Sequence, residues 1–406
     1  MVEIRFITGD EVIDFRRAIT AGFGGDEPDD LQVAERFLDL HPPETPIAAF
    51  DRGRIVATFS SFDLDMTVPG SSLPTAGTTA VTVSPTHRRR GILTEMMTMH
   101  LRQAIERDQA MAALWASEEK IYGRFGYGYA AGGLHIIIPA ANVSLPTGPD
   151  DVEIVPIGPG QAVELLPPVF ERFVARTPGS FARWPGWWRQ RHFHDPERRR
   201  PPGTTTRRHV VAERAGAAAG YAVYRQESKW TSDGAEGTVH VVELVADDDG
   251  VRRALWHFLS TVDLFPMVEH WNAPVDDPVL IEADRFRALR TAWRDSLWLR
   301  LLDVRTALQA RRYEHDGALV LDVADRYLDR GGRFELVVDE GAARCRPVTA
   351  TADVELDIAE LSALYLGGRS ADRLARADRI GGSAAGIEAL DRIFRTTTAP
   401  YCIEVF

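Results

Sequence analysis

The chain has 406 residues, enough for two or three domains, and its 45% hydrophobic and 26% charged residues are typical of a soluble globular protein. A formal net charge of −12 disfavours nucleic acid as a partner and is compatible with a cationic substrate. The two cysteines, Cys345 and Cys402, form neither a disulfide framework nor a metal-ligand cluster, so we expect no metal. MVEIRFITGDE lacks the pattern of a signal peptide and no apolar run approaches 18 residues, which indicates a cytoplasmic protein without a membrane span.

Residues 1–150 are predicted to form a first α/β domain. Short β-rich runs alternate there with helical patterns; the runs are IAAFD, IVATFSSF, GTTAVTVSP, AALWAS and LHIIIPA. From Gly91 to Glu106, apolar residues recur with a period of 3.6, which predicts a helix with one buried face. The turn-forming stretch PTGPDD ends the domain.

Residues 151–293 repeat this order in a second domain. PGQAVELLPPVFERFV predicts a helix, HVVAERAGAAAGYAVYRQE a hairpin, and TVHVVELVADDDGVRRALWHFLS a strand, loop and helix. We interpret the basic stretch HDPERRRPPGTTTRRH as an exposed connection in preference to an anion site.

Residues 294–406 predict a third, α+β domain. Its expected strands are SLWLRLLDV, FELVVDE, DVELDI and YCIEVF, and its expected helices are VRTALQARR, IAELSALYLGG and GIEALDRIFR.

Two loops between a strand and a helix can be compared. The loop of the first domain is SPTHRRRG and that of the second is VADDDG. A helix N-terminus attracts anions, and arginines strengthen such a site, whereas three aspartates fill it with their own carboxylates. If the two domains are duplicates, only the first can hold a phosphorylated cofactor.

The first loop resembles motif A of the GNAT acetyltransferases, Gln/Arg-x-x-Gly-x-Gly/Ala. Arg88 and Gly91 match the first two fixed positions, whereas Leu93 replaces the last small residue. A glycine lets the backbone approach a pyrophosphate, and arginines add charge. The alternative is that these arginines are merely solvated near the start of a helix.

A second stretch, ASEEKIYGRFGYG from Ala116 to Gly128, makes the resemblance more specific. Together with PTHRRRGIL it is similar to the enhanced-intracellular-survival (Eis) family of bacterial N-acetyltransferases, and SLWLRLLDV, GGRFELVVDEGAARC, LYLGG and the terminal phenylalanine resemble that family's C-terminal part. The resemblance implies two tandem GNAT-like domains followed by a sterol-carrier-like domain. It also implies acetyl transfer from acetyl-CoA to amines, notably to several amines of aminoglycosides, and a homohexamer.

The resemblance implies the following site residues. Val81, Thr82 and Val83 would border the pantetheine and thioester; Arg88, Arg89, Arg90, Gly91, Ile92, Leu93 and Thr94 would cradle the pyrophosphate; Ser117 and Glu118 would lie beside the cofactor. Tyr122 would be the general acid, and the C-terminal carboxylate of Phe406 the general base.

These residue types suit the chemistry. The amine arrives largely as an ammonium, so a carboxylate must accept its proton, and a tyrosine with a pKa of about 10 can protonate the leaving thiolate. Tyr122 has close neighbours in Tyr127 and Tyr129, so its alternative role is to anchor a glycine-rich turn. The alternative for Phe406 is a strand end that only packs.

The acceptor site is the less defined part. Asp26 and Glu404 are candidates for binding a cationic acceptor, although Asp26 fits a helix cap or a solvated loop equally well. Ala80 stands where the family can carry a larger aromatic residue, and the segment GFGGDEPDDLQVAERFL lacks an expected tryptophan. A protein lysine as acceptor, and an inactive lipid-binding or interaction protein, remain the alternatives.

Overall fold

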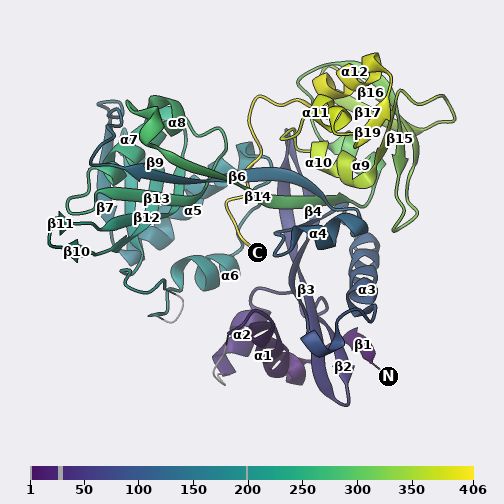
Figure 1. The fold of residues 1–406 in the computed structure, drawn as a ribbon, viewed down its shortest axis with the longest axis horizontal. Coiled ribbons are helices and arrows are strands. Elements are labelled where there is room, and N and C mark those ends of the chain that lie inside the picture. The colour runs from purple at the N-terminus through teal and green to yellow at the C-terminus, as the bar shows by residue number, and fades with distance from the viewer. Residues whose placement is uncertain (1, 26–30, 198–199) are drawn as a thin grey trace.

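The structure is a computed structural model that describes residues 2–25, 31–197 and 200–406. The chain forms three units, and strands of the first two join in one sheet (Figure 1). Within the described ranges this sheet is 12-stranded, in the order β1-β2-β3-β4-β5-β14-β6-β13-β12-β9-β8-β7. None of the helices in these ranges has the length and apolar character of a membrane span.

The first unit follows the predicted alternation of strands and helices. Its elements are β1 (Glu3–Phe6), α1 (Val12–Gly22), α2 (Leu31–Leu38), β2 (Ile47–Asp51), β3 (Arg54–Val68), β4 (Ser71–Val83), α3 (Ile92–Glu106), β5 (Met111–Leu114), α4 (Glu119–Tyr122) and β6 (Gly128–Pro139). The amphipathic helix predicted from Gly91 to Glu106 is α3, which buries Met96, Met97 and Leu101 against the sheet.

The second unit repeats the order of the first. It contains β7 (Val152–Ile157), α5 (Pro159–Arg176), α6 (Pro185–Trp187), β8 (Arg208–Arg214), β9 (Ala217–Glu227), the short hairpin β10 (Trp230–Thr231) and β11 (Gly234–Ala235), β12 (Thr238–Ala246), α7 (Asp249–Ser260), β13 (Met267–Ala273) and α8 (Val279–Glu282). The predicted helix, hairpin and strand-loop-helix segment are α5, β8 with β9, and β12 with α7.

Two strands join the first two units. β6 pairs with β13 of the second unit along one edge, and β14 (Arg290–Leu301) pairs with β6 along its other edge and with β5 beyond it. The expected domain boundary at residue 293 therefore falls inside β14, and SLWLRLLDV contributes to the large sheet. Figure 1 shows both strands running across the middle of the molecule.

The third unit packs on these crossing strands. Its elements are α9 (Val304–Ala310), β15 (Gly317–Ala324), β16 (Gly332–Asp339), β17 (Ala342–Pro347), β18 (Val354–Asp357), α10 (Ile358–Leu364), α11 (Ala371–Arg376), β19 (Ile380–Gly382) and α12 (Ala384–Phe394). Its strands form a separate 5-stranded sheet in the described part of the chain. α10 lies against β6 at Gly128, where a Cβ atom would stand 1.8 Å from the carbonyl oxygen of Ala359.

The strand predicted for YCIEVF is wrong. Residues 401–406 belong to neither a helix nor a strand, and hydrogen bonds from loops and side chains hold their backbone in place of a strand ladder. Tyr401, Cys402 and Phe406 are nevertheless buried. The alternation of apolar residues reflects burial on two sides of an extended segment, which a sequence pattern cannot distinguish from a strand.

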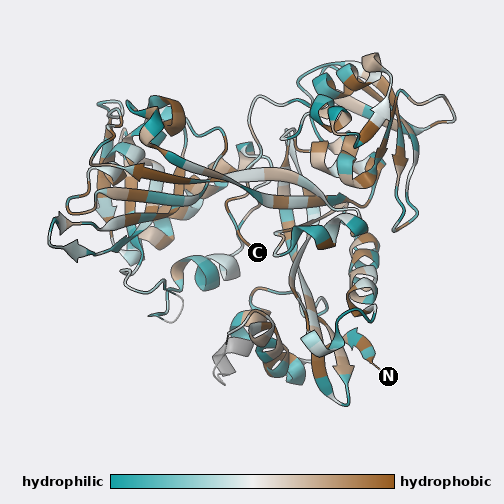
Figure 2. Ribbon diagram, in the orientation of Figure 1, coloured by the Kyte–Doolittle hydropathy of each residue, from teal (hydrophilic) through white to brown (hydrophobic). Residues whose placement is uncertain are grey.

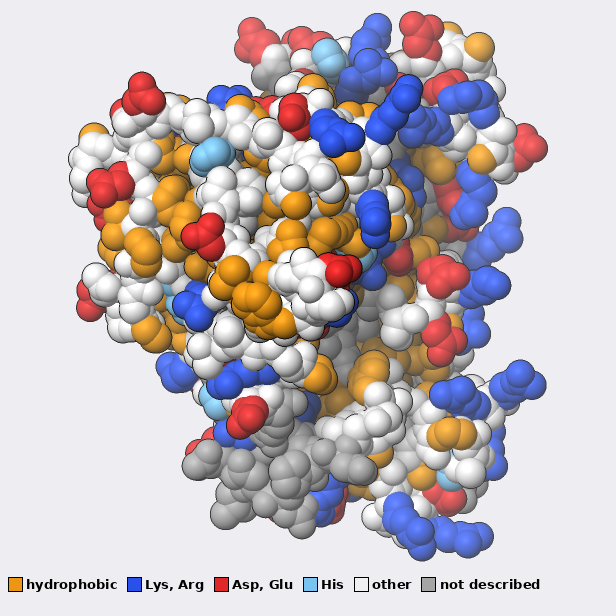
Figure 3. Space-filling model, turned by 60° about the vertical axis from the view of Figure 1, so that its left-hand side comes forward, with side chains coloured by type: hydrophobic (Ala, Val, Ile, Leu, Met, Phe, Trp, Pro, Cys, Tyr) orange, Lys and Arg blue, Asp and Glu red, His pale blue; other side chains and the backbone are white. Residues whose placement is uncertain are grey.

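Apolar residues collect on the strands and on the inward faces of the helices (Figure 2). One cluster lies between α3 and the first part of the sheet, and a second between α7 and the second part. A third cluster runs from β3 and β14 into the third unit, so the third unit shares a core with the first. The view in Figure 3 shows further apolar side chains gathered on the surface among charged ones.

Candidate active site

β4 and β5 pair over a short distance and then separate. Their parallel pairing ends at Gly77 opposite Ala113. Beyond this point β4 carries a bulge, because two of its residues, Ala80 and Val81, face a single residue of β3, and Ala80 adopts a left-handed φ of 54°. The separation exposes the last residues of β4 to a cavity.

This cavity, which we call the donor cavity, has a volume of about 780 Å³. Its walls contain Val81, Thr82 and Val83 of β4, the loop and helix residues Arg88, Arg89, Gly91, Ile92, Leu93 and Thr94, and Ser117, Glu118 and Tyr122. The structure thus brings together the residues expected at the cofactor, except Arg90. The side chain of Arg90 turns away and donates to the carbonyl of Thr86 at 2.8 Å.

The N-terminus of α3 opens onto the donor cavity without a capping side chain. Its N-cap is Gly91, whose left-handed φ of 83° favours glycine. The first intrahelical bond runs from the N–H of Glu95 to the carbonyl of Gly91, so the preceding N–H groups of the first turn have no partner in the helix. Together with Arg88 and Arg89, these groups can bind a phosphorylated ligand.

Tyr122 is the one of the three neighbouring tyrosines that lines this cavity. Its ring is 5% exposed and lies edge-on to Tyr127, with 6.1 Å between ring centroids. Burial raises the pKa of Tyr122, and a hydrogen bond with the Ser117 side chain opposes this only in part. The hydroxyl therefore keeps its proton at neutral pH and can act as an acid.

The other two tyrosines have structural partners. Tyr127 is buried with its hydroxyl 2.9 Å from that of Thr78, and Trp293 donates to the hydroxyl of Tyr129 at 2.7 Å. The sequence could not separate the three, because all of them lie in one glycine-rich stretch.

The chain ends at the junction of the first two units. Figure 1 shows the C-terminus next to β3 and below the crossing strands. The buried ring of Phe406 lies edge-on to Phe62 of β3 at 6.4 Å and to Phe181 at 5.5 Å. Since Phe62 pairs with Gly77, the chain end lies near the point where β4 leaves β5.

Of the two residues predicted to bind a cationic acceptor, Asp26 and Glu404, the structure describes only Glu404. The carboxylate of Glu404 is 12% exposed and forms an ion pair with Arg183, so it already has a partner within the protein. Asp26 lies outside the residues that the structure describes.

The sequence analysis missed His41, which stacks on the same ring, Phe62, that contacts Phe406. Its ring is stacked between Phe37 and Phe62, at 4.0 and 4.2 Å, and its Nδ1 lies 2.9 Å from the hydroxyl of Ser60. Burial lowers the pKa of His41 to about 3, so the imidazole is neutral. No motif surrounds this histidine, and only the stacking in the folded chain distinguishes it from others.

The second unit lacks the open helix end of the first. Asp248 caps α7 by accepting from the N–H of Val251 at 3.0 Å, and it pairs with Arg214. Asp247 is bound by Arg172 and Arg176. The protein's own carboxylates therefore occupy the position that a phosphate would take.

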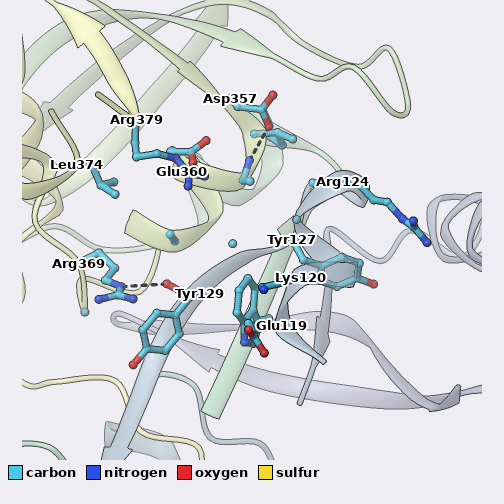
Figure 4. Close-up of a pocket in the computed structure, with 18 of the residues that line it drawn as sticks. Glu119, Lys120, Arg124, Tyr127, Tyr129, Asp357, Glu360, Arg369, Leu374 and Arg379 are labelled. Atoms are coloured by element: carbon cyan, nitrogen blue, oxygen red, sulfur yellow. Dashed lines mark hydrogen bonds and ion pairs between the residues drawn. The ribbon is translucent and has the colours of Figure 1, made fainter. Parts of the chain in front are cut away.

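A second cavity, of about 880 Å³, lies between the first and third units (Figure 4). Figure 4 shows Tyr129 and Arg369 on one side of it, where Arg369 donates to the carbonyl of Tyr129 at 3.2 Å, and Glu360 beside Arg379 on another. It contains neither Tyr122 nor the arginine loop, so its larger size does not make it the donor site. Among the described residues, no three His, Cys, Asp or Glu side chains are grouped to hold a metal ion.

Family models match all three units. Models of the acetyltransferase (GNAT) domain match residues 3–130 and 179–311, and a model of the sterol carrier protein domain matches residues 304–403. The N-acetyltransferase Eis of Mycobacterium tuberculosis is 34% identical over 349 residues, which are 78% of this chain and 77% of that protein. The chain belongs to the Eis family of GNAT N-acetyltransferases. This confirms the predicted fold and family.

Further relatives of this Eis-family chain agree along its whole length. An N-acetyltransferase of Streptomyces avermitilis is 37% identical over 414 residues, which cover 100% of this chain and 99% of that protein. The crystal structure of Eis1 from Mycobacterium abscessus superposes with a TM-score of 0.85 at 32% identity and covers all of both chains. A GCN5-related N-acetyltransferase from Anabaena variabilis, 18% identical with a TM-score of 0.84 and full coverage of both chains, shares the fold. The protein is thus a GNAT-type N-acetyltransferase, and its fold implies the use of acetyl-CoA.

Proposed function

We propose that this Eis-family enzyme transfers the acetyl group of acetyl-CoA directly to amines of cationic small molecules, with aminoglycosides as acceptors that are acetylated at several positions. The observation that carries the proposal is the donor cavity, which is lined by both an uncapped helix N-terminus and a buried tyrosine. Acetyl transfer from acetyl-CoA needs a site that binds the pyrophosphate of the cofactor and a general acid that protonates the leaving thiolate.

The donor is bound at three places along the cavity. The first turn of α3, with Arg88 and Arg89, suits the pyrophosphate, while the backbone of Val81 and Val83 suits the pantetheine and the thioester carbonyl. Acetyl-CoA supplies the activated acyl group and a thiolate leaving group. Since Gly91 has no atom within 4 Å of where a Cβ would stand, open space lies in front of the loop.

Two groups move the protons of the transfer. Tyr122 protonates the leaving thiolate, because burial keeps its hydroxyl neutral. The C-terminal carboxylate of Phe406 accepts the proton of the attacking amine. The burial of Phe406 against Phe62 and Phe181 supports this role, because a chain end usually frays unless contacts hold it.

The acceptor is proposed from charge. The chain carries a formal net charge of −12, which favours a cationic acceptor over an anionic one. Asp26 stays a candidate for contact with an acceptor ammonium. Glu404 is a weaker candidate for such a contact, since its side chain is only 12% exposed and is already paired with Arg183.

The proposal includes a homohexamer in the cytoplasm. Large apolar side chains exposed on the described surface support an assembly, among them Ile281 at 89%, Phe286 at 68% and Trp293 at 59%. A subunit interface would remove these side chains from water.

The deciding experiment follows the release of CoA thiol with acetyl-CoA and a panel of amines that contains aminoglycosides, polyamines and lysine peptides. We expect turnover with aminoglycosides, and mass spectrometry of the product should show more than one added acetyl group. Turnover with lysine peptides alone would replace the small-molecule acceptor by a protein. An absence of turnover with every amine, together with bound acetyl-CoA, would contradict the proposal.

A further inference from the structure

The second unit contains its own pair of separating strands. β12 and β13 pair in parallel only as far as Val241 opposite His270, and β12 then carries a bulge between Val241 and Glu243. This is the arrangement that opens the donor cavity between β4 and β5 in the first unit. We propose that the separated strands of the second unit form a docking cleft for the protein's own C-terminal segment, Tyr401–Phe406, and that Arg183 holds the segment there.

Backbone hydrogen bonds fix the segment at its first residues. The N–H of Tyr401 donates to the carbonyl of Pro178 at 2.8 Å, and the hydroxyl of Ser180 donates to the carbonyl of Tyr401 at 2.8 Å. Asn272, on β13, accepts from the Tyr401 hydroxyl through its carbonyl at 2.6 Å, and its side-chain amide donates to the carbonyl of Cys402 at 3.1 Å. The segment is therefore bound to the strand that has left β12.

Apolar contacts fix the segment on both of its sides. Tyr401 and Ile403 pack into the cluster that contains Val242 and Val245 of β12. Cys402 and Phe406 pack into the cluster that the first and third units share. These contacts on both sides place the segment between the second unit and the other two.

Arg183 holds the charged residue of the segment. Its guanidinium is 2% exposed and pairs with both Glu404 and Glu243 of β12. It also lies over the rings of Phe170 and Trp188, at 3.7 and 4.4 Å. Burying a carboxylate costs desolvation free energy, which an opposite charge nearby offsets. Arg183 provides this charge for Glu404.

Residues of the second unit alone hold Glu243 next to Arg183. Tyr221 donates its hydroxyl to Glu243, which lies at the bulge of β12 and accepts from Arg183 Nη1 at 3.1 Å. Burial opposes the charge of Glu243, but the charge of Arg183 and the hydrogen bonds from Arg183 and Tyr221 outweigh it and hold the pKa of Glu243 below its ordinary range. The carboxylate therefore stays charged and keeps Arg183 oriented toward Glu404.

This docking gives the second unit a role that needs no cofactor. Its helix end is filled by Asp248, yet its strands still separate, and the opening receives a peptide of the same chain. Glu404 precedes Phe406 by two residues, so the ion pair positions the chain end against β3. The expected effect on kcat rests on the proposed function, because the docked segment ends in the proposed base. The docking of the segment is independent of the proposed function.

Three variants test the inference in the full-length chain. Arg183→Met removes the central charge, and Glu404→Gln removes the partner on the segment while the pair of Arg183 and Glu243 remains. Arg172→Met is the matched control, because Arg172 forms an exposed ion pair with Asp247 in the same unit. Each folded variant is treated with a carboxypeptidase, and mass spectrometry measures the release of the last residues. Steady-state kinetics with acetyl-CoA and an accepted amine accompany the digestion.

We expect release from Glu404→Gln and Arg183→Met to be at least about tenfold faster than from the unchanged protein, with Arg172→Met at the unchanged rate. The kcat of Glu404→Gln and of Arg183→Met should fall, and that of Arg183→Met by about 10²-fold. The KM for acetyl-CoA should stay unchanged in both variants, because neither residue lines the donor cavity. Glu404→Gln keeps the test valid if Arg183→Met does not fold. Equal release from all four proteins would overturn the docking. Faster release with unchanged kcat would uphold the docking and remove Phe406 as the base.

Discussion

The ring of Phe62, in the middle of β3, lies edge-on to the ring of Phe406, with 6.4 Å between their centroids. Phe62 also stacks on His41 and lies at 5.2 Å from Trp187. The last residue of the chain is therefore enclosed by aromatic rings next to the strand pair that opens into the donor cavity. This contact supports the proposal that the carboxylate of Phe406 is the general base.

Phe406→Leu should keep most of the activity, whereas a short tag after Phe406 should abolish it. The leucine retains the terminal carboxylate and loses only ring contacts, at about 1 kcal/mol of stability. The tag converts that carboxylate to an amide and adds residues next to the packed rings of Phe62 and Phe181. The kcat should therefore fall by about 10²-fold or more. The same tag at the N-terminus is the control. Intact turnover with the C-terminal tag would show that the base lies elsewhere.

Replacing Arg88 and Arg89 together by alanine should weaken the donor. Each charge-assisted hydrogen bond contributes about 1.5–3 kcal/mol, so the KM for acetyl-CoA should rise tenfold or more (about 1.4 kcal/mol per tenfold) with a smaller change in the KM for the amine. Arg90→Ala is the control, because its side chain is bound to the Thr86 carbonyl outside the cavity wall. Calorimetry measures the same affinity directly, and unchanged binding by the double variant would refute the site.

Tyr122→Phe should lower kcat by about 10²-fold and leave acetyl-CoA binding intact. The phenylalanine keeps the ring that packs on Tyr127 and removes only the proton donor. Tyr129→Phe is the control, since the hydroxyl of Tyr129 is bound to Trp293 and lines the other cavity. Normal turnover of Tyr122→Phe would return Tyr122 to the role of an anchor for the glycine-rich turn.

Calorimetric titration should find one acetyl-CoA per chain. The helix end of the second unit is occupied by Asp248, and the neighbouring aspartate is held by arginines. Asp248→Ala should cost about 1 kcal/mol of stability through the lost cap and create no second site. A stoichiometry of two in either protein would show that the second unit binds the cofactor.

The protein should lose stability steeply in mild acid. Burial lowers the pKa values of His41, His100, His192 and His270 to about 3 each. Below an unfolded pKa of about 6.5 the unfolded chain binds protons that the folded chain excludes, so each of these histidines lowers the free energy of unfolding as the pH falls below about 6.5.

His100→Gln tests this pH dependence, because the glutamine can keep the hydrogen bond to Thr78 but cannot titrate. Urea unfolding at about pH 7 and pH 5 measures the loss. The difference between the two pH values should be smaller in the variant than in the unchanged protein. An equal difference would mean that His100 titrates normally in the folded state.

Much of the architecture was predictable from local patterns. The period of 3.6 in residues 91–106, the hairpin of residues 209–227 and the arginine loop before a helix all depend on neighbours in sequence, and all recur in the structure. The contrast between SPTHRRRG and VADDDG was readable too, because a cap is a local interaction between a side chain and the next turn.

The sequence by itself determined the family, the order of the units and the donor loop, because these depend on residues close together in the chain. Tertiary structure alone decided that β14 lies between β5 and β6, that Tyr122 and not Tyr127 or Tyr129 faces the donor cavity, and that residues 401–406 are no strand. Each of these depends on contacts between segments far apart in sequence. The periodicity of apolar residues predicts that a residue is buried but does not identify the residues that it contacts. The ion pair of Arg183 with Glu404 likewise forms between two segments far apart in sequence, which only the fold brings together and removes from water.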